Sequence, residues 1–131
     1  MNGVARPTSL PRLGQPLSWP WLVTGLALVF ALSVGAVLTT PPGARISVWW
    51  PAAGLSAALF LLEDRRRWPR VTVLLVVVTG LANLAAGREP AVSAVFGVAN
   101  SAEALTIAWL LTGGGPRRYL LDALSDIRRL V

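Results

Sequence analysis

The chain has 131 residues, of which 54% are hydrophobic and 14% are charged, and its mean hydropathy is +0.61. Because a soluble domain carries about a quarter of its residues as charges, this composition excludes an ordinary soluble domain and favours a protein that lies in lipid. All 12 basic residues are arginine, and they stand in short clusters between apolar blocks. Membrane topology therefore explains the net charge of +6 better than nucleic-acid binding does.

The absence of cysteine and histidine removes much of the chemistry that a small enzyme uses. Disulfides, thiolate nucleophiles, imidazole bases and the usual zinc sites all need one of these two residue types. The sequence also shows no Gly-rich phosphate loop, no serine nucleophile with a base and no pair of catalytic carboxylates. It therefore predicts no catalytic residue, no metal site and no cofactor, and we do not expect the chain to be an enzyme.

The first apolar block follows a Pro/Gly/Ser-containing tail, residues 1–18, which is predicted to be disordered. The block itself, 19–38, holds no charge, and its length of about 20 residues matches a hydrocarbon core of about 30 Å. We expect an uncleaved transmembrane helix rather than a signal peptide, because the apolar region of a signal peptide has only about 7–15 residues. Ala27, Ala31 and Gly35 form a stripe of small residues that permits close helix contact.

The second and third spans are predicted at about 48–62 and 71–86. Pro51 suits the first turn of a short helix in the second span, where its missing N–H costs nothing. Trp49 and Trp50 precede that turn as aromatic residues of the membrane interface. The third span begins with β-branched residues, but a single strand in lipid leaves its backbone groups without partners, so we expect a helix.

The fourth span is predicted at 91–111, and the glycines and proline after Thr112 end it. In the last segment, 117–131, apolar residues recur at helical spacing and charged residues occupy the other faces, which predicts an amphipathic helix at the membrane surface. The predicted fold class is therefore all-α: a polytopic transmembrane helical bundle of about four spans with a C-terminal amphipathic helix.

The arginines are distributed unevenly between the two sides of these spans. Two lie in the N-terminal tail, four between the second and third spans and four after the fourth span, which is ten of the 12. The positive-inside rule places these ten in the cytoplasm, which predicts a multi-pass protein of the bacterial plasma membrane with both termini cytoplasmic. Arg65, Arg66, Arg67 and Arg70 are expected to fix this topology and to contact anionic lipid head groups of the bilayer.

Glu103 is the one ionisable residue inside a predicted span, and its insertion costs roughly 2.5–3.5 kcal/mol. We therefore expect it to face the bundle interior. Asn100 lies about one turn away on the same helix, and Asn83 is the polar residue of the preceding span, near its outer end. Two interpretations stay open: a protonated Glu103 bonded to an asparagine as a structural pair, or a ligand- or proton-sensing site lined by Asn83, Asn100 and Glu103.

Three stretches together resemble a known family: residues 47–55 (SVWWPAAGL), 65–69 (RRRWP) and 96–105 (FGVANSAEAL). In order and spacing they are similar to the first family of bacterial membrane-associated sensor domains, the MASE type. The similarity extends over residues 20–131. The positions that match its pattern are Trp50, Pro51, Gly54, Asn83, Asn100 and Glu103.

The resemblance implies a sensory input module for signal transduction, which in relatives precedes a cytoplasmic output domain such as a kinase, cyclase, phosphodiesterase or phosphatase. Residues 19–131 then correspond to the N-terminal half of such a domain, so we expect a truncated member without its output domain. The alternative is a small dimerising transporter-like or channel-like protein, indicated by polar residues within a span and by the small-residue stripes. A non-functional gene remnant is a third interpretation. A homodimer stays open, and no nucleic-acid partner is expected.

Overall fold

The computed structural model describes residues 16–41 and 50–112, and within these ranges the chain is helical, with no strand. Four α-helices and one short 3-10 helix, η1, follow one another along it. They are α1 (Trp19–Leu38), α2 (Pro51–Leu62), η1 (Arg65–Arg67), α3 (Trp68–Ala85) and α4 (Pro90–Leu111). The predicted all-helical fold is confirmed. The predicted amphipathic helix at 117–131 and nearly all of the predicted tail lie outside the described residues.

A proline within the first two positions marks the start of each α-helix. Proline suits this place because it needs no N–H partner there and its fixed φ is already helical. α1 has the predicted bounds, and α4 begins one residue before the predicted start. α3 begins at Trp68 rather than at residue 71, because Pro69 lies in its first turn and the preceding arginines form η1.

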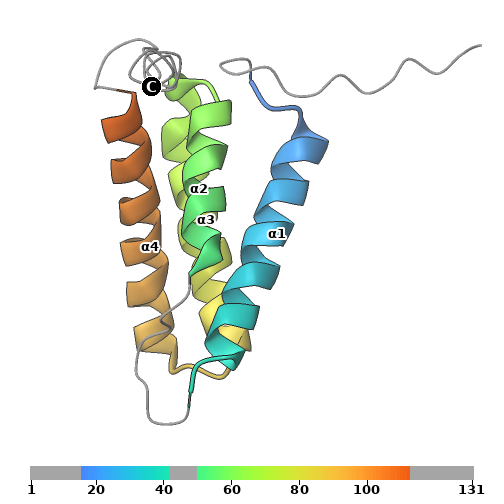
Figure 1. Ribbon diagram of the computed structural model, residues 1–131, viewed down its shortest axis with the longest axis vertical. Coiled ribbons are helices and arrows are strands. Elements are labelled where there is room, and N and C mark those ends of the chain that lie inside the picture. The colour runs from blue at the N-terminus through green and yellow to red at the C-terminus, as the bar shows by residue number, and fades with distance from the viewer. Residues whose placement is uncertain (1–15, 42–49, 113–131) are drawn as a thin grey trace, which may run out of the picture.

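Consecutive helices run in opposite directions, and α1 and α4 lie on opposite sides of the pair formed by α2 and α3 (Figure 1). The start of α1, the end of α4 and η1 lie at one end of the bundle (Figure 1). We call this the arginine end, after Arg65, Arg66, Arg67 and Arg70. The Arg70 guanidinium stacks over the Trp19 ring at 4.8 Å, which joins the start of α3 to the start of α1.

Three helical segments are long and apolar enough to cross a membrane: α1, η1 together with α3, and α4. α2 has 12 residues, or about 18 Å, which is shorter than a hydrocarbon core of about 30 Å. It begins at Pro51, as the proline indicated, and residues 48 and 49 of the predicted second span lie outside the described residues. Because α2 ends beside η1, it covers only the half of the bundle next to the arginine end (Figure 1).

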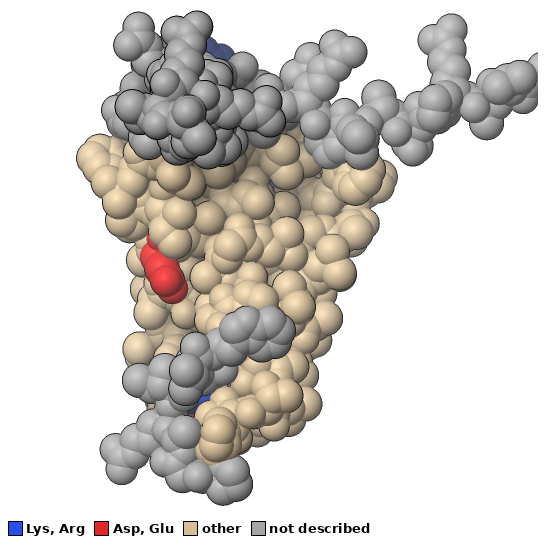
Figure 2. All heavy atoms as spheres, in the orientation of Figure 1, with Lys and Arg blue, Asp and Glu red and all other residues tan. Residues whose placement is uncertain are grey.

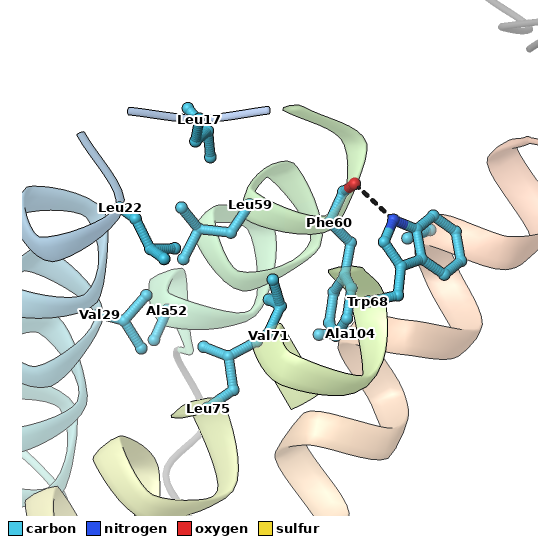
Figure 3. Packing of buried hydrophobic residues seen from close by; sticks show 11 residues of the cluster. Leu17, Leu22, Val29, Ala52, Leu59, Phe60, Trp68, Val71, Leu75 and Ala104 are labelled. Carbon is cyan, nitrogen blue, oxygen red and sulfur yellow. Dashed lines mark hydrogen bonds between the residues drawn. The ribbon is translucent and has the colours of Figure 1, made fainter. Parts of the chain in front are cut away.

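An apolar cluster fills the half of the bundle that α2 covers (Figure 3). Its buried members are Leu17, Leu22, Val29, Ala52, Leu59, Phe60, Trp68, Val71, Leu75, Ala104 and Ala108. Trp68 donates its indole N–H to the Phe60 carbonyl at 2.9 Å, and the two rings pack edge to face with centroids 5.5 Å apart. The indole N–H is thus satisfied inside the cluster, as buried tryptophans require.

The outer surface of the described bundle is also apolar. Large exposed side chains include Leu28, Phe30, Val73, Val77, Leu81, Val95, Val98, Trp109 and Leu110. The face in Figure 2 is correspondingly almost free of charge along its described length. An apolar surface of this extent is unfavourable in water and suits lipid, which together with the length of the three spans supports a membrane protein.

α3 and α4 make a close backbone contact at Gly97. A Cβ atom added there would lie 2.6 Å from the Val76 carbonyl oxygen and 3.2 Å from the Gly80 backbone nitrogen. Only glycine fits at this crossing, which is the small-residue packing typical of membrane helices.

The small-residue stripe predicted on α1 does not make this kind of contact. Ala27 and Ala31 are exposed and Gly35 is half-buried, with no atom within 4 Å of a Cβ added to Gly35. The expectation of close contact through this stripe is therefore wrong for the described helices. The buried face of α1 is formed by Leu22, Gly25, Val29, Ser33 and Ala36.

Candidate functional site

The buried faces of α1, α3 and α4 change from largely apolar to small or polar along the axis of the bundle. Every buried residue is small or polar in three segments: the part of α1 after Val29, the part of α3 after Leu75, and the part of α4 before Ala104. These residues are Ser33, Ala36, Thr79, Ala82, Asn83, Ser93, Gly97 and Ser101. The five with polar side chains, Ser33, Thr79, Asn83, Ser93 and Ser101, are called the polar core below. They lie from the middle of the bundle toward the end opposite the arginine end.

Several hydrogen bonds of the polar core end on backbone carbonyls. The Thr79 hydroxyl donates to the Leu75 carbonyl at 2.6 Å and lies 3.4 Å from the Gly97 carbonyl across the helix crossing. The Asn83 amide nitrogen donates to the Thr79 carbonyl at 2.8 Å. The Ser93 hydroxyl lies 3.5 Å from the Arg88 carbonyl. These side chains satisfy donors locally, so burying them costs little.

Three buried polar atoms of α1 and α4 have no hydrogen-bond partner in the part of the chain that the structure describes. They are the Ser33 hydroxyl, the Ser101 hydroxyl and the side-chain nitrogen of Asn100. Leaving such a group unsatisfied costs about 1–3 kcal/mol, more than a typical hydrogen bond contributes. Buried groups of this kind are commonly satisfied by a water molecule or by a bound polar ligand.

The sequence-predicted site residues occupy three different environments. Asn83 is fully buried in the polar core, Asn100 is half-buried at its margin, and Glu103 is exposed. The expectation that Glu103 faces the bundle interior is wrong. The buried stripe of α4 includes Ser101 and Ala104, and Glu103 is turned by about 100° from its neighbour Ala104. Figure 2 accordingly shows acidic atoms (red) on the outer surface among uncharged side chains.

Asn83 and Glu103 are also far apart along the bundle axis. Thr79 lies level with Gly97, since their hydroxyl and carbonyl oxygens are 3.4 Å apart. Asn83 lies four residues from this level toward the α3–α4 loop, and Glu103 lies six residues from it toward the arginine end. At about 1.5 Å per residue the separation is about 15 Å, so the predicted three-residue site is not assembled.

Three residues that match the sensor-family pattern lie at the start of α2 or directly before it. Trp50 precedes the helix and packs against the apolar cluster, and Pro51 is in the first turn. Gly54 is exposed, and no atom lies within 4 Å of a Cβ added to it. The role of these residues as a family signature stays a prediction.

The acidic residues beside the arginines have structural partners. The Glu63 carboxyl is 2% exposed and lies 3.9 Å from the Arg67 guanidinium. Asp64 caps η1, because its carboxylate accepts the backbone N–H of Arg66 at 3.1 Å. Arg65, Arg66, Arg67 and Arg70 are all exposed, so this end of the bundle carries a net positive charge.

Most of the polar core was missed by the sequence-based selection of site residues, which named only Asn83 from it. The signal was present as a repeat of small residues four positions apart, Ser93, Gly97 and Ser101, and as the pair Thr79 and Asn83. Such a repeat marks the contact face of a membrane helix. The repeat alone does not show which helix packs against it, and the structure identifies that helix as α3.

Comparisons with protein-family models, with curated proteins and with solved structures find no match to this chain. The resemblance to the sensor family therefore rests on the quoted stretches alone.

Proposed function

We propose that the chain is a membrane-embedded sensory input module of a bacterial signal-transduction protein of the MASE type, and that the polar core is its sensing element. The observation that carries this proposal is the set of unsatisfied buried groups on Ser33, Asn100 and Ser101. An apolar interior would stabilise the bundle at lower cost. Polar groups that lack partners in the resting protein are suited to a ligand that supplies them.

The chemistry of the polar core defines the class of ligand. Hydroxyl and amide groups line it, and its five residues include no charged side chain. A small uncharged molecule with hydrogen-bonding groups fits this lining better than an ion does. In the orientation proposed here the arginine end is cytoplasmic, so the ligand reaches the polar core from the outer side of the membrane.

Ligand binding acts on α4 in this proposal, because two of the three unsatisfied groups belong to it. α4 crosses α3 backbone against backbone at Gly97, and in this proposal α4 shifts against α3 at this crossing. The end of α4 lies at the arginine end, from which the movement passes to the cytoplasmic side.

The test uses the full chain in lipid nanodiscs and a set of small uncharged polar solutes. A sensing solute should raise the thermal unfolding midpoint of the wild type but not of Ser33→Ala or Ser101→Ala. Thr106→Ala is the matched control, because it removes an exposed hydroxyl of α4 that bonds to the Ala102 carbonyl. Equal responses of wild type and Ser101→Ala would overturn the proposal, and solute flux across liposomes would favour the transporter-like alternative.

A further inference from the structure

Glu103 places a carboxyl group on the outer surface of the bundle, within the length of a candidate membrane span. It lies about 12 Å from the end of α4 at Leu111 and about 20 Å from the start of this helix at Pro90. Figure 2 shows acidic atoms on this surface among uncharged side chains. Ionisable groups inside a membrane almost always face protein or water rather than lipid, so we expect a protein neighbour at this carboxyl group.

No such neighbour lies within the part of the chain that the structure describes. Within residues 16–41 and 50–112, Glu103 makes no hydrogen bond and no ion pair. The helices that pack against α4 are α3 and α2. The one arginine of α3, Arg70, stacks over Trp19 of α1, on the side of the bundle opposite α4. A partner for Glu103 therefore comes from outside the described bundle.

The side of α4 around Glu103 is suited to contact with another helix. Exposed residues recur there every three or four positions, which places them along one side of the helix. They are Val92, Val95, Ala99, Glu103, Thr106 and Leu110, and we call them the Glu103 face. Ala99 and Thr106, one turn on either side of the carboxyl group, are small, so a second helix can approach closely there.

The chemistry of the carboxyl group favours a second copy of this chain as the partner. In its protonated form a carboxyl group has one O–H donor as well as acceptor oxygens, so two of them can hydrogen-bond to each other. Two copies that cross the membrane in the same direction also have Glu103 at the same depth. A different helix would need a polar residue of its own at that depth.

We propose that two copies of the chain dimerise through the Glu103 face, with the two α4 helices parallel and their Glu103 carboxyl groups hydrogen-bonded to each other. The two-fold axis then runs along the membrane normal, and the same surface of both copies meets. The buried residues of α4, among them Gly97 and Ser101, lie on the opposite side of the helix from the Glu103 face. Each copy thus keeps its own polar core, and the dimer is independent of the ligand proposed for that core.

The first test measures energy transfer between donor-labelled and acceptor-labelled copies of the full chain in liposomes, over a range of protein-to-lipid ratios. Labels are attached at Glu89→Cys, which introduces the only cysteine. In this background Glu103→Leu should raise the dissociation constant of the dimer roughly tenfold, because the hydrogen bonds between the carboxyl groups are lost. Glu103→Gln should stay within about threefold, because an amide also carries donors and an acceptor.

A second substitution tests the packing of the Glu103 face. Ala99→Leu adds bulk beside the carboxyl group, so it should hold the two α4 helices apart and raise the dissociation constant roughly tenfold. Ala31→Leu is the matched control, because it makes the same change at an exposed position of α1. Its effect on the dissociation constant should stay below about twofold.

Disulfide trapping locates the interface. Ala99 and Val77 are both exposed, and each lies two residues toward the arginine end from the level at which Thr79 meets Gly97. Ala99→Cys and Val77→Cys therefore place a thiol at the same depth, on the Glu103 face of α4 and on α3 respectively. Under a mild oxidant, Ala99→Cys should give a disulfide-linked dimer in liposomes and Val77→Cys should not.

Three results would overturn the proposal. Absence of energy transfer at every protein density in the chain with Glu103 intact would show that the chain is monomeric. Equal weakening by Glu103→Gln and Glu103→Leu would indicate a cationic partner group rather than a second carboxyl group. Equal disulfide trapping at the two cysteine positions would show random collision of copies rather than a defined interface.

Discussion

Most threonine hydroxyls on the described helices donate to a backbone carbonyl of their own helix, and two serines differ from this pattern. Each of the following threonines donates to the carbonyl four residues earlier: Thr72, Thr79, Thr106 and Thr112. Serine can do the same, yet the Ser33 and Ser101 hydroxyls do not. We expect Ser33→Ala and Ser101→Ala to leave the free energy of unfolding without ligand unchanged or slightly higher, because no protein hydrogen bond is lost.

Trp68→Phe should lower the free energy of unfolding by about 1–2 kcal/mol, because the buried hydrogen bond to the Phe60 carbonyl is lost. Reversible unfolding by denaturing detergent, followed by circular dichroism, measures this difference. Trp109→Phe makes the same chemical change at an exposed position and should cost much less. Similar effects of the two substitutions would contradict the anchoring role of Trp68.

Gly97→Ala should destabilise the bundle by about 1–3 kcal/mol, because its Cβ would meet the backbone of α3 at Val76 and Gly80. Gly35→Ala is the control, since a Cβ there meets no atom within 4 Å, and it should be neutral or stabilising. The same unfolding assay compares them. A bundle that tolerates both substitutions equally would refute the close α3–α4 contact.

Glu103→Gln should leave both stability and the solute response of the wild type unchanged, because Glu103 is exposed outside the polar core. Asn100→Leu should instead abolish the response, since it removes the unsatisfied amide at the margin of the polar core. Nanodisc thermal shifts with the same solutes measure both. If Glu103→Gln lost the solute response and Asn100→Leu kept it, the carboxyl group of Glu103 and not the polar core would be the sensing group.

At the scale of elements, the helix bounds could be predicted from the sequence, whereas the helix faces could not. A proline lies within the first two positions of each described α-helix, and the lengths of the apolar blocks fix where α1 and α4 end. In lipid, however, the outer face is as apolar as the interior, so no amphipathic pattern shows which side is buried. The stripe at Ala27 and the stripe at Gly97 look alike in sequence, and only the approach of α3 distinguishes them. The orientation of Glu103 was wrong for the same reason.

Considering the whole molecule, the charged residues that the structure describes lie toward the two ends of the bundle, with the exception of Glu103. The four arginines of the arginine end lie together with the start of α1 and the end of α4, while Arg88 and Glu89 lie in the opposite loop. This separation agrees with the arginine distribution in the sequence. The assignment of the arginine end to the cytoplasm stays a prediction.

Single-cysteine variants test that assignment without background, because the chain contains no cysteine. Glu89→Cys should react with a membrane-impermeant maleimide on intact cells, since its loop is predicted to face outward and the residue is exposed. Arg66→Cys should react only after the membrane is permeabilised. The reverse pattern of labelling would overturn the predicted orientation.

The short length of α2 also gives the two halves of the bundle different mechanical properties. Beside the arginine end, four helices share a core of large apolar side chains, and the Trp68 hydrogen bond clamps α2 to α3. In the other half, α3 contacts α1 and α4 through small or polar side chains, which interlock less than large apolar ones. We expect slow amide hydrogen exchange in the first half and fast exchange in the second. The end of the bundle beside the arginines is then rigid, and the opposite end deforms more easily.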